Sequence, residues 1–182
     1  MRIVDLKSLD RAGRQQAAEI LVAAFGEHWP DAWPSLEDAL EEVEESFGEG
    51  RLSRAAMDEG GQVMGWIGGI REYNGHAWEL HPLAVDPQHQ KRGIGTALVR
   101  DFEEQVRSRG GSGVYLGADD EANLTSLAGI DLYPNVLEQA ASIRNLKRHP
   151  FGFYQKVGYT IVGVIPDANG FGKPDILMAK RL

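Results

Sequence analysis

A strand-like segment of the chain carries two titratable side chains two positions apart. It is the run WELHPLAV, residues 78–85. Alternate residues of a regular strand share one face. Here these residues are Glu79, His81, Leu83 and Val85. A carboxylate beside an imidazole can move a proton, so the segment is a candidate for acid–base chemistry. Pro82 cannot donate to a ladder, which predicts interrupted pairing and backbone groups available to a ligand.

A polar loop with two glycines follows this strand directly. Its sequence is QKRGIG, residues 90–95, and helical periodicity begins immediately after it. Glycines let backbone N–H groups approach an anion, the helix N-terminus adds partial positive charge, and Lys91 and Arg92 add formal charge. The dinucleotide fingerprint would need a third glycine where Leu98 stands, and the Walker ending is absent. The loop therefore predicts a pyrophosphate site, and it favours a functional role for Glu79 and His81 over a structural one.

The elements before these two segments are predicted from apolar periodicity and turn signals. A helix is expected over Arg11–Phe25, then a loop, HWPDAWPS, whose Trp-Pro pairs break helices. Ser35 opens a second helix with Asp38 in the capping-box position and an apolar stripe reaching Phe47. The turn sequences EGGQ and EYNGH predict an antiparallel meander. Its strands are Leu52–Asp58, Val63–Arg71 and Ala77–Val85, after a first short strand at residues 2–6.

The elements after the loop alternate between helix and strand. A helix over Ile94–Arg109 is expected first, and residues 118–133 are expected to be largely irregular. The remaining elements are strands Val114–Gly117, Tyr159–Ile165 and Asp175–Lys180 and helices Val136–Leu146 and Pro150–Gly158. Mixed elements of this kind predict an α/β (α+β) layered fold. No repeat or linker is visible, so one domain over residues 1–182 is expected.

Bulk composition excludes several classes of protein. The chain has 182 residues, 42% hydrophobic and 25% charged, which suits neither a disordered nor a membrane protein. It has no cysteine, which excludes disulfides, thiolate metal sites and thioester intermediates on the protein. The N-terminus lacks a signal-peptide core and no run could cross a bilayer, so we expect a cytoplasmic protein that does not bind membranes.

The charge of the chain favours cationic partners. A formal net charge of -8 argues against binding to duplex nucleic acid. Many acidic residues fall in a stretch that contains no Lys or Arg. They are Asp31, Glu37, Asp38, Glu41, Glu42, Glu44, Glu45 and Glu49. Such a stretch can attract a polyamine, or it can be the solvated face of a helix, and both interpretations stay open.

Two levels of family resemblance attach to these motifs. QKRGIG resembles the Q/R-x-x-G-x-G/A signature of the GNAT superfamily, which binds the pyrophosphate of acetyl-coenzyme A. Residues 78–180 further resemble chromosomally encoded aminoglycoside 6'-N-acetyltransferases. The matching runs are WELHPLAV, SRGG, VYLGADD, LYPNVLEQAASIRNLKRHPFGFYQKVGY and VGVIPDANGFGKPDILMAK. EANLTSLAG departs from that pattern and leaves the range of drugs open.

The resemblance implies a fold, a reaction and partners. The GNAT fold has a mixed, mostly antiparallel central sheet flanked by helices. The implied reaction is direct acetyl transfer from acetyl-coenzyme A to the 6'-amine of an aminoglycoside in a ternary complex, without a metal. The partner is thus a cationic small-molecule amine, and a homodimer is expected. A GNAT enzyme for another amine, such as a polyamine or a protein N-terminus, and a non-catalytic acyl-coenzyme A binding module remain alternatives.

The resemblance also assigns roles to individual residues. Glu79 is the base that deprotonates the amine through water, and His81 helps to shape the site. Leu83 offers its N–H to the thioester oxygen, and Tyr154 interacts with the leaving thiolate, although without the family it reads equally as a core aromatic residue. The implied cofactor-binding residues are Leu83, Val85, Gln90, Lys91, Arg92, Gly93, Gly95, Thr96 and Tyr154. The implied substrate-binding residues are Trp29, Trp33, Glu79, Asp119 and Asp120, with parts of the acidic helix.

Overall fold

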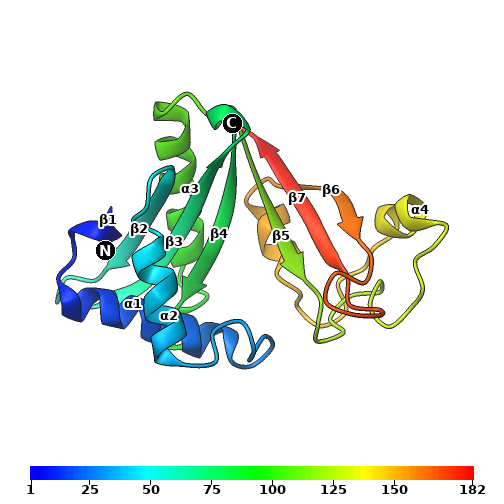
Figure 1. Cartoon of the computed structure of the whole chain (residues 1–182), viewed down its shortest axis with the longest axis horizontal. Helices are drawn as coiled ribbons and strands as arrows, with labels where there is room; N and C mark the ends of the chain where they lie inside the picture. Colours follow the sequence, from blue (N-terminus) through cyan, green and yellow to red (C-terminus); the bar gives the residue numbers. More distant parts are fainter. The chain divides into compact units, whose positions relative to one another are not determined.

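The computed structural model describes residues 1–182 and divides the chain into two compact units (Figure 1). The first unit is Met1–Ser112 with Leu182, and the second is Gly113–Arg181. Strands β1–β4 and helices α1–α3 belong to the first unit, and β5–β7 with α4 and α5 belong to the second. We describe each unit by itself.

The first unit is built on an antiparallel sheet in the order β1-β2-β3-β4. The strands are β1 (Arg2–Asp5), β2 (Arg51–Met57), β3 (Val63–Glu72) and β4 (Ala77–Val85). The helices are α1 (Arg11–Phe25), α2 (Leu36–Glu45) and α3 (Ile94–Ser108), with short 3-10 turns at Leu6–Ser8, Tyr73–Gly75 and Pro87–His89. The predicted meander and the three predicted helices are thus confirmed, within a few residues at their ends.

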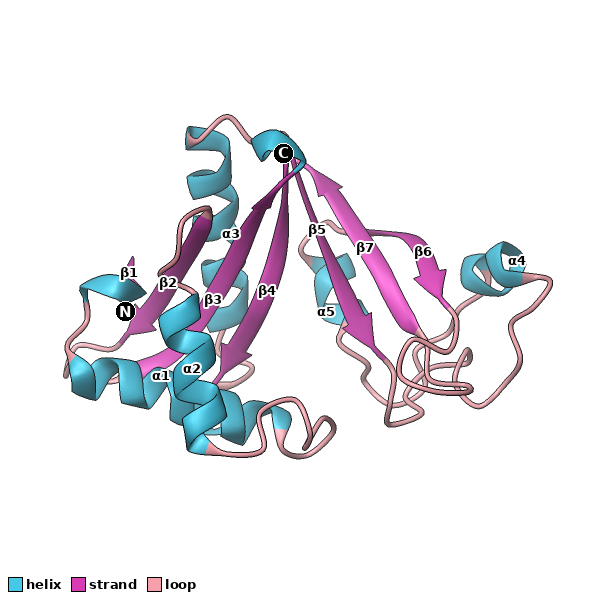
Figure 2. Ribbon diagram, viewed as in Figure 1, coloured by secondary structure: helices cyan, strands magenta, loops and turns pink.

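Helices cover both faces of this sheet (Figure 2). Helices α1 and α2 pack together on one face, where Trp66 of β3 is fully buried and donates its Nε1–H to the carbonyl of Ala17 on α1 at 3.1 Å. Helix α3 lies on the other face, where Phe102 is fully buried beside Gly69 of β3. A β3 side chain that points the same way as Trp66 therefore faces α1 and α2, and one that points toward Phe102 faces α3.

The start of α2 has the predicted N-cap residue, Ser35, with Asp38 at the position of a capping box. The Ser35 Oγ accepts a hydrogen bond from the Asp38 N–H, and the two side chains also contact each other at 2.6 Å. A cap of this kind stabilises a helix by about 1 kcal/mol. The helix ends at Glu45, earlier than the apolar stripe to Phe47 suggests, because the N–H groups of Phe47 and Gly48 bond to carbonyls only three residues back, at Glu44 and Glu45.

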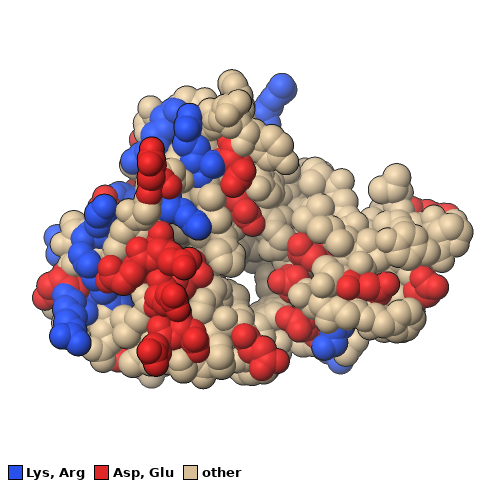
Figure 3. All heavy atoms as spheres, viewed as in Figure 1, with Lys and Arg blue, Asp and Glu red and all other residues tan.

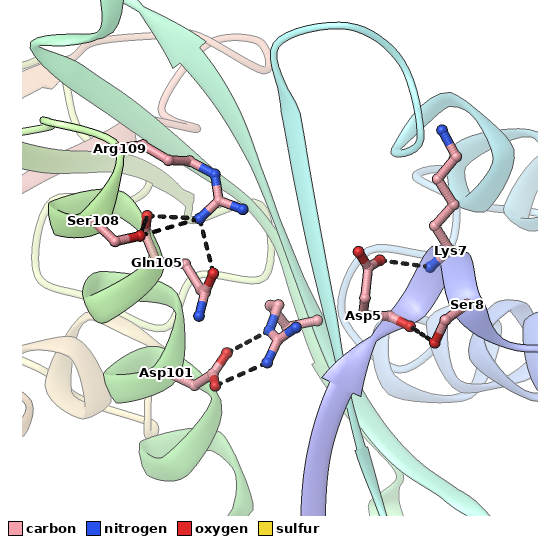
Figure 4. A network of polar contacts seen from close by, with 8 residues as sticks. Asp5, Lys7, Ser8, Asp101, Gln105, Ser108 and Arg109 are labelled. Atoms are coloured by element: carbon pink, nitrogen blue, oxygen red, sulfur yellow. Dashed lines mark hydrogen bonds and ion pairs between the residues drawn. The ribbon is translucent and has the colours of Figure 1, made fainter.

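A paired arginine and aspartate join β2 to α3. Asp101 of α3 accepts two hydrogen bonds from the Arg54 guanidinium, at 2.6 and 3.1 Å, and both side chains are largely buried. The two dashed lines at the labelled Asp101 in Figure 4 mark these bonds. Two-point geometry of this kind fixes orientation as well as distance. It anchors the middle of α3 to the sheet and so fixes the helix whose first turn follows the predicted phosphate loop.

The second unit has an antiparallel sheet in the order β5-β7-β6. Its elements are β5 (Gly113–Asp119), α4 (Val136–Ala141), α5 (Phe151–Lys156), β6 (Thr160–Ile165) and β7 (Asp175–Arg181). Helix α4 is shorter than the predicted Val136–Leu146, because Asn145 forms a bridge with Thr125 and Arg144 bonds to Ser126. The predicted fold class, a mixed and mostly antiparallel sheet flanked by helices, is confirmed.

Candidate active site

Strand β4, which carries the predicted catalytic residues Glu79 and His81, is interrupted by a bulge. Leu80 pairs with Gly69 and Leu83 with Ile67, so that His81 and Pro82 together oppose one residue of β3. The interruption that Pro82 predicts is therefore confirmed. An extra residue in one strand reverses the alternation of side chains beyond it.

The bulge corrects the expectation that four alternate residues share one face. Glu79 pairs with Ile70, which points the same way as Trp66, toward α1 and α2. Leu83 pairs with Ile67, on the face of α3, and Val85 follows Leu83 at the next alternate position. The regular-strand assumption is thus wrong: Glu79 faces α1 and α2, whereas the side chains of Leu83 and Val85 face α3.

His81 lies at the bulge with two neighbours from the α1–α2 face. Its Nε2 is 4.0 Å from Oε1 of Glu42 on α2, and its ring centroid is 5.9 Å from that of Trp33. The His81 side chain is 45% exposed and the Glu42 side chain 18% exposed. An imidazole, an indole and a half-buried carboxylate therefore line one side of the strand that carries Glu79.

Aromatic rings continue this surface beyond His81. The ring of Phe25, at the end of α1, packs edge-on against Trp33 at 4.7 Å and tilted against Trp29 at 5.7 Å between ring centroids. Both tryptophans are partly buried. Acidic side chains gather over α2 on the same unit (Figure 3). Rings with carboxylates beside them suit a ligand that carries ammonium groups.

The candidate phosphate loop has the backbone that an anion site needs. Lys91 and Gly93 have φ of 62° and 83°, and a Cβ placed on Gly93 would meet nothing within 4 Å. No side chain caps the N-terminus of α3, so that Gly95 and Thr96 in its first turn keep N–H groups without a helical partner. Lys91 and Arg92 are exposed, and Gln90 bonds to the Val85 carbonyl at 3.2 Å. Successive N–H groups in this conformation form an anion-binding concavity that fits a pyrophosphate.

Tyr154 lies in the second unit, on α5, and is buried. Its ring packs against those of Phe153 at 5.2 Å and Tyr159 at 5.7 Å. Burial raises the pKa of the Tyr154 hydroxyl well above its usual value. A phenol of this kind stays protonated at neutral pH and can act as a donor.

The two predicted aspartates after β5 differ in environment. Asp119 is partly exposed and accepts a hydrogen bond from the Asn169 side chain. Asp120 is fully buried, and its two oxygens accept the N–H groups of Leu124 and Thr125 at 2.6 and 2.8 Å. The predicted amine-binding role of Asp120 is therefore not supported, because its carboxylate holds the following loop together.

A buried histidine supports the same loop. His149 is 1% exposed and accepts the Phe151 N–H at Nδ1, so its Nε2–H donates to the Asp119 carbonyl at 3.1 Å. Burial lowers the pKa of His149 below its usual value, although the neighbouring carbonyl and carboxylates oppose this shift. Both ring nitrogens of the neutral imidazole are engaged in hydrogen bonds to the backbone, so the role of His149 is structural.

Sequence reasoning named Glu42 only as one of many acidic residues. The signal that distinguishes it is its position on α2, where Ala39 and Val43 are buried. At 100° per residue, Glu42 lies closest of the α2 glutamates to this buried face. The contact of Glu42 with His81 joins two different elements, α2 and β4, and the helical periodicity of α2 alone does not predict it.

The structure contains neither a membrane-spanning helix nor a cluster of metal-ligating side chains. No helix of the chain is long and apolar enough to cross a membrane. No group of three or more histidine and acidic side chains is arranged to hold a metal ion.

Comparison with known proteins assigns the family. The acetyltransferase (GNAT) family model matches residues 14–133, so the chain belongs to the GNAT acetyltransferase family. A crystal structure of an aminoglycoside 6'-N-acetyltransferase complexed with coenzyme A is 42% identical, with a TM-score of 0.89. The aminoglycoside 6'-N-acetyltransferase from Enterococcus faecium is also 42% identical, with a TM-score of 0.85. An aminoglycoside 6'-acetyltransferase type Ii is 36% identical, with a TM-score of 0.74.

Each of these three alignments covers 100% of this chain and 97% of the other. No curated protein sequence gives a significant match. The chain is thus an acetyltransferase of the GNAT family whose similarity to aminoglycoside 6'-N-acetyltransferases extends over its full length.

Proposed function

We propose that the protein transfers the acetyl group of acetyl-coenzyme A to the 6'-amine of aminoglycosides. The observation that carries the proposal is the arrangement of residues along β4. Glu79 and His81 lie on a surface of aromatic and acidic side chains, and the end of the same strand leads into the candidate phosphate loop. Full-length similarity to aminoglycoside 6'-N-acetyltransferases supports the choice of substrate. The acidic chain suits a polycation.

Acetyl-coenzyme A supplies an acetyl group activated as a thioester. In our proposal the loop binds its pyrophosphate through N–H groups at the start of α3 and through side-chain charge. The residues that do so are Gln90, Lys91, Arg92, Gly93, Gly95 and Thr96. Leu83 and Val85, between the bulge and the loop, contact the acyl arm, with the Leu83 N–H bonding to the thioester oxygen. A fixed donor at that oxygen stabilises the charge that develops there.

Glu79 then acts as the general base. It removes a proton from the 6'-amine through a water molecule, while His81 shapes the polar surface around it. The amine attacks the thioester directly in a ternary complex, so that positioning supplies much of the rate. Tyr154 donates a hydrogen bond to the departing thiolate, for which its hydroxyl stays protonated because burial raises its pKa, and the thiolate takes its proton from water.

The remaining ammonium groups of the drug bind to the aromatic and acidic side chains. Trp29 and Trp33 offer ring faces, and Asp119 and Glu79 offer carboxylates. We also propose that residues 1–182 act as one GNAT domain, that the protein works as a cytoplasmic homodimer, and that antibiotic resistance is the outcome of its activity. The homodimer and the antibiotic resistance rest on the family resemblance, whereas the single domain and the cytoplasmic location rest on the length and hydropathy of the chain.

Thiol release measured over a panel of amines tests the proposal. We expect kanamycin A and tobramycin to be acetylated far faster than spermidine or a peptide with a free N-terminus. Brisk acetylation of spermidine or of the peptide alone would contradict the aminoglycoside assignment. Binding of acetyl-coenzyme A without release of thiol for any amine would indicate a binding module instead of an enzyme.

The phosphate loop is tested by ligand-induced stabilisation. Saturating coenzyme A should raise the melting temperature by about 5 to 10 °C, because a ligand selective for the folded state stabilises it. In Gly93→Val the increase should be largely lost, since valine is strained at positive φ and places a side chain in the loop.

Gly110→Val is the matched control. Gly110 has φ of 82° and an equally open surrounding, but it follows α3 instead of preceding it. This variant should be destabilised to a similar extent while keeping the full ligand-induced increase in scanning calorimetry. Equal loss in both variants, or no increase in the wild type, would refute the loop as the binding site.

A further inference from the structure

A contact between Glu42 and His81 joins α2, the acidic helix, to β4, the strand that carries Glu79. Glu42 Oε1 is 4.0 Å from His81 Nε2, while Trp33 flanks the same imidazole at 5.9 Å between ring centroids. An exposed histidine at a strand bulge would otherwise be free to change rotamer. A carboxylate and an indole next to the ring restrict that freedom.

The burial of the two partners is unequal. The Glu42 side chain is 18% exposed and the His81 side chain 45% exposed. Glu42 emerges next to Val43, which is fully buried in the core between α1, α2 and β3. The carboxylate therefore comes from a helix that is packed on the core, and the imidazole is the more exposed member of the pair.

We propose that Glu42 is a positioning residue that holds His81 against Trp33 for recognition of the acceptor amine. This inference rests on the proposed function, because it assigns the His81 surface to the amine and not to acetyl-coenzyme A. Glu42 acts through His81, so its contribution disappears when His81 is absent. We expect Glu42 to affect binding of the amine more than binding of the cofactor, because the proposed cofactor loop begins at Gln90, nine residues after His81.

A double-mutant cycle tests the coupling. Glu42→Gln keeps the shape of the side chain and removes its charge, and we expect it to raise KM for the best acceptor amine about two- to five-fold, the size expected for one weak, partly exposed polar contact. KM for acetyl-coenzyme A and kcat should change little. In the His81→Gln background, Glu42→Gln should have no further effect. Glu104→Gln, an exposed glutamate on α3, carries the same charge change and should leave all three parameters unaltered.

A second measurement reads the position of the imidazole without any turnover. In protein labelled on its histidine rings, the His81 signals are assigned by their absence in His81→Gln, and Glu42→Gln should shift them more than those of His28, His76, His89 or His149. An unmoved His81 signal, or additive KM effects in the cycle, would overturn the proposal. Failure of the proposed function appears already in the wild-type protein, as acetylation of a different amine, and the cycle is then run with that amine.

Discussion

Kanamycin A and tobramycin should each gain one acetyl group on the 6'-nitrogen, whereas analogues with a 6'-hydroxyl should gain none there. The physical reason is the nucleophile. A carboxylate such as Glu79 can deprotonate an ammonium group through water, but an alcohol presents a far weaker nucleophile to the same base. The other ammonium groups remain in the analogue, so that it should still bind and compete with the amino drug.

Mass spectrometry of the products from a matched 6'-amino and 6'-hydroxy pair measures this outcome. Fragmentation of the acetylated drug reports the ring that carries the new group. Added salt should raise KM for the amino drug, because exposed charges on α2 and at Asp119 are screened. Equal acetylation of both drugs, or acetylation on another ring, would contradict the assigned position.

Replacing the proposed base, Glu79, should have the largest effect of any single substitution. Glu79→Gln preserves the volume of the side chain and removes its basicity, so we expect turnover to fall about 100- to 10,000-fold. Affinity for coenzyme A should stay near the wild-type value, because the loop that we propose to bind it lies beyond the bulge. Tyr154→Phe should cost less, since water can protonate a thiolate, which is a good leaving group.

The control for this experiment is Glu59→Gln. Glu59 is an exposed glutamate in the turn between β2 and β3, where the same loss of charge should leave turnover unchanged. Steady-state kinetics and titration calorimetry separate turnover from affinity. Full activity of Glu79→Gln at neutral pH would exclude this carboxylate as the base and direct attention to His81.

Local sequence signals predicted the elements of the first unit well. The capping box at Ser35 and Asp38, the turn sequences and the glycines of the loop each act over a few residues. Such signals can therefore be read without knowing what packs against them. Helix α4 was predicted too long because the pairing of Thr125 with Asn145 joins residues far apart in the chain.

The arrangement of the site was less accessible to sequence reasoning. Pro82 indicated broken pairing, but the change of face at Leu83 depends on the register of β4 against β3. The burial of Asp120 depends on the loop that folds around it, and the approach of Glu42 to His81 depends on how α2 packs. Each is a tertiary property, which one sequence without homologues does not reveal.

The bulge also divides β4 into two halves that can vary separately. Substitutions at Glu79 or His81 alter the face toward α1 and α2, and substitutions of the Leu83 or Val85 side chains alter the opposite face. A strand of regular alternation would expose all four to the same surroundings. A new acceptor could therefore be accommodated by changes in the first half alone, while the half that leads into the phosphate loop keeps its packing against α3.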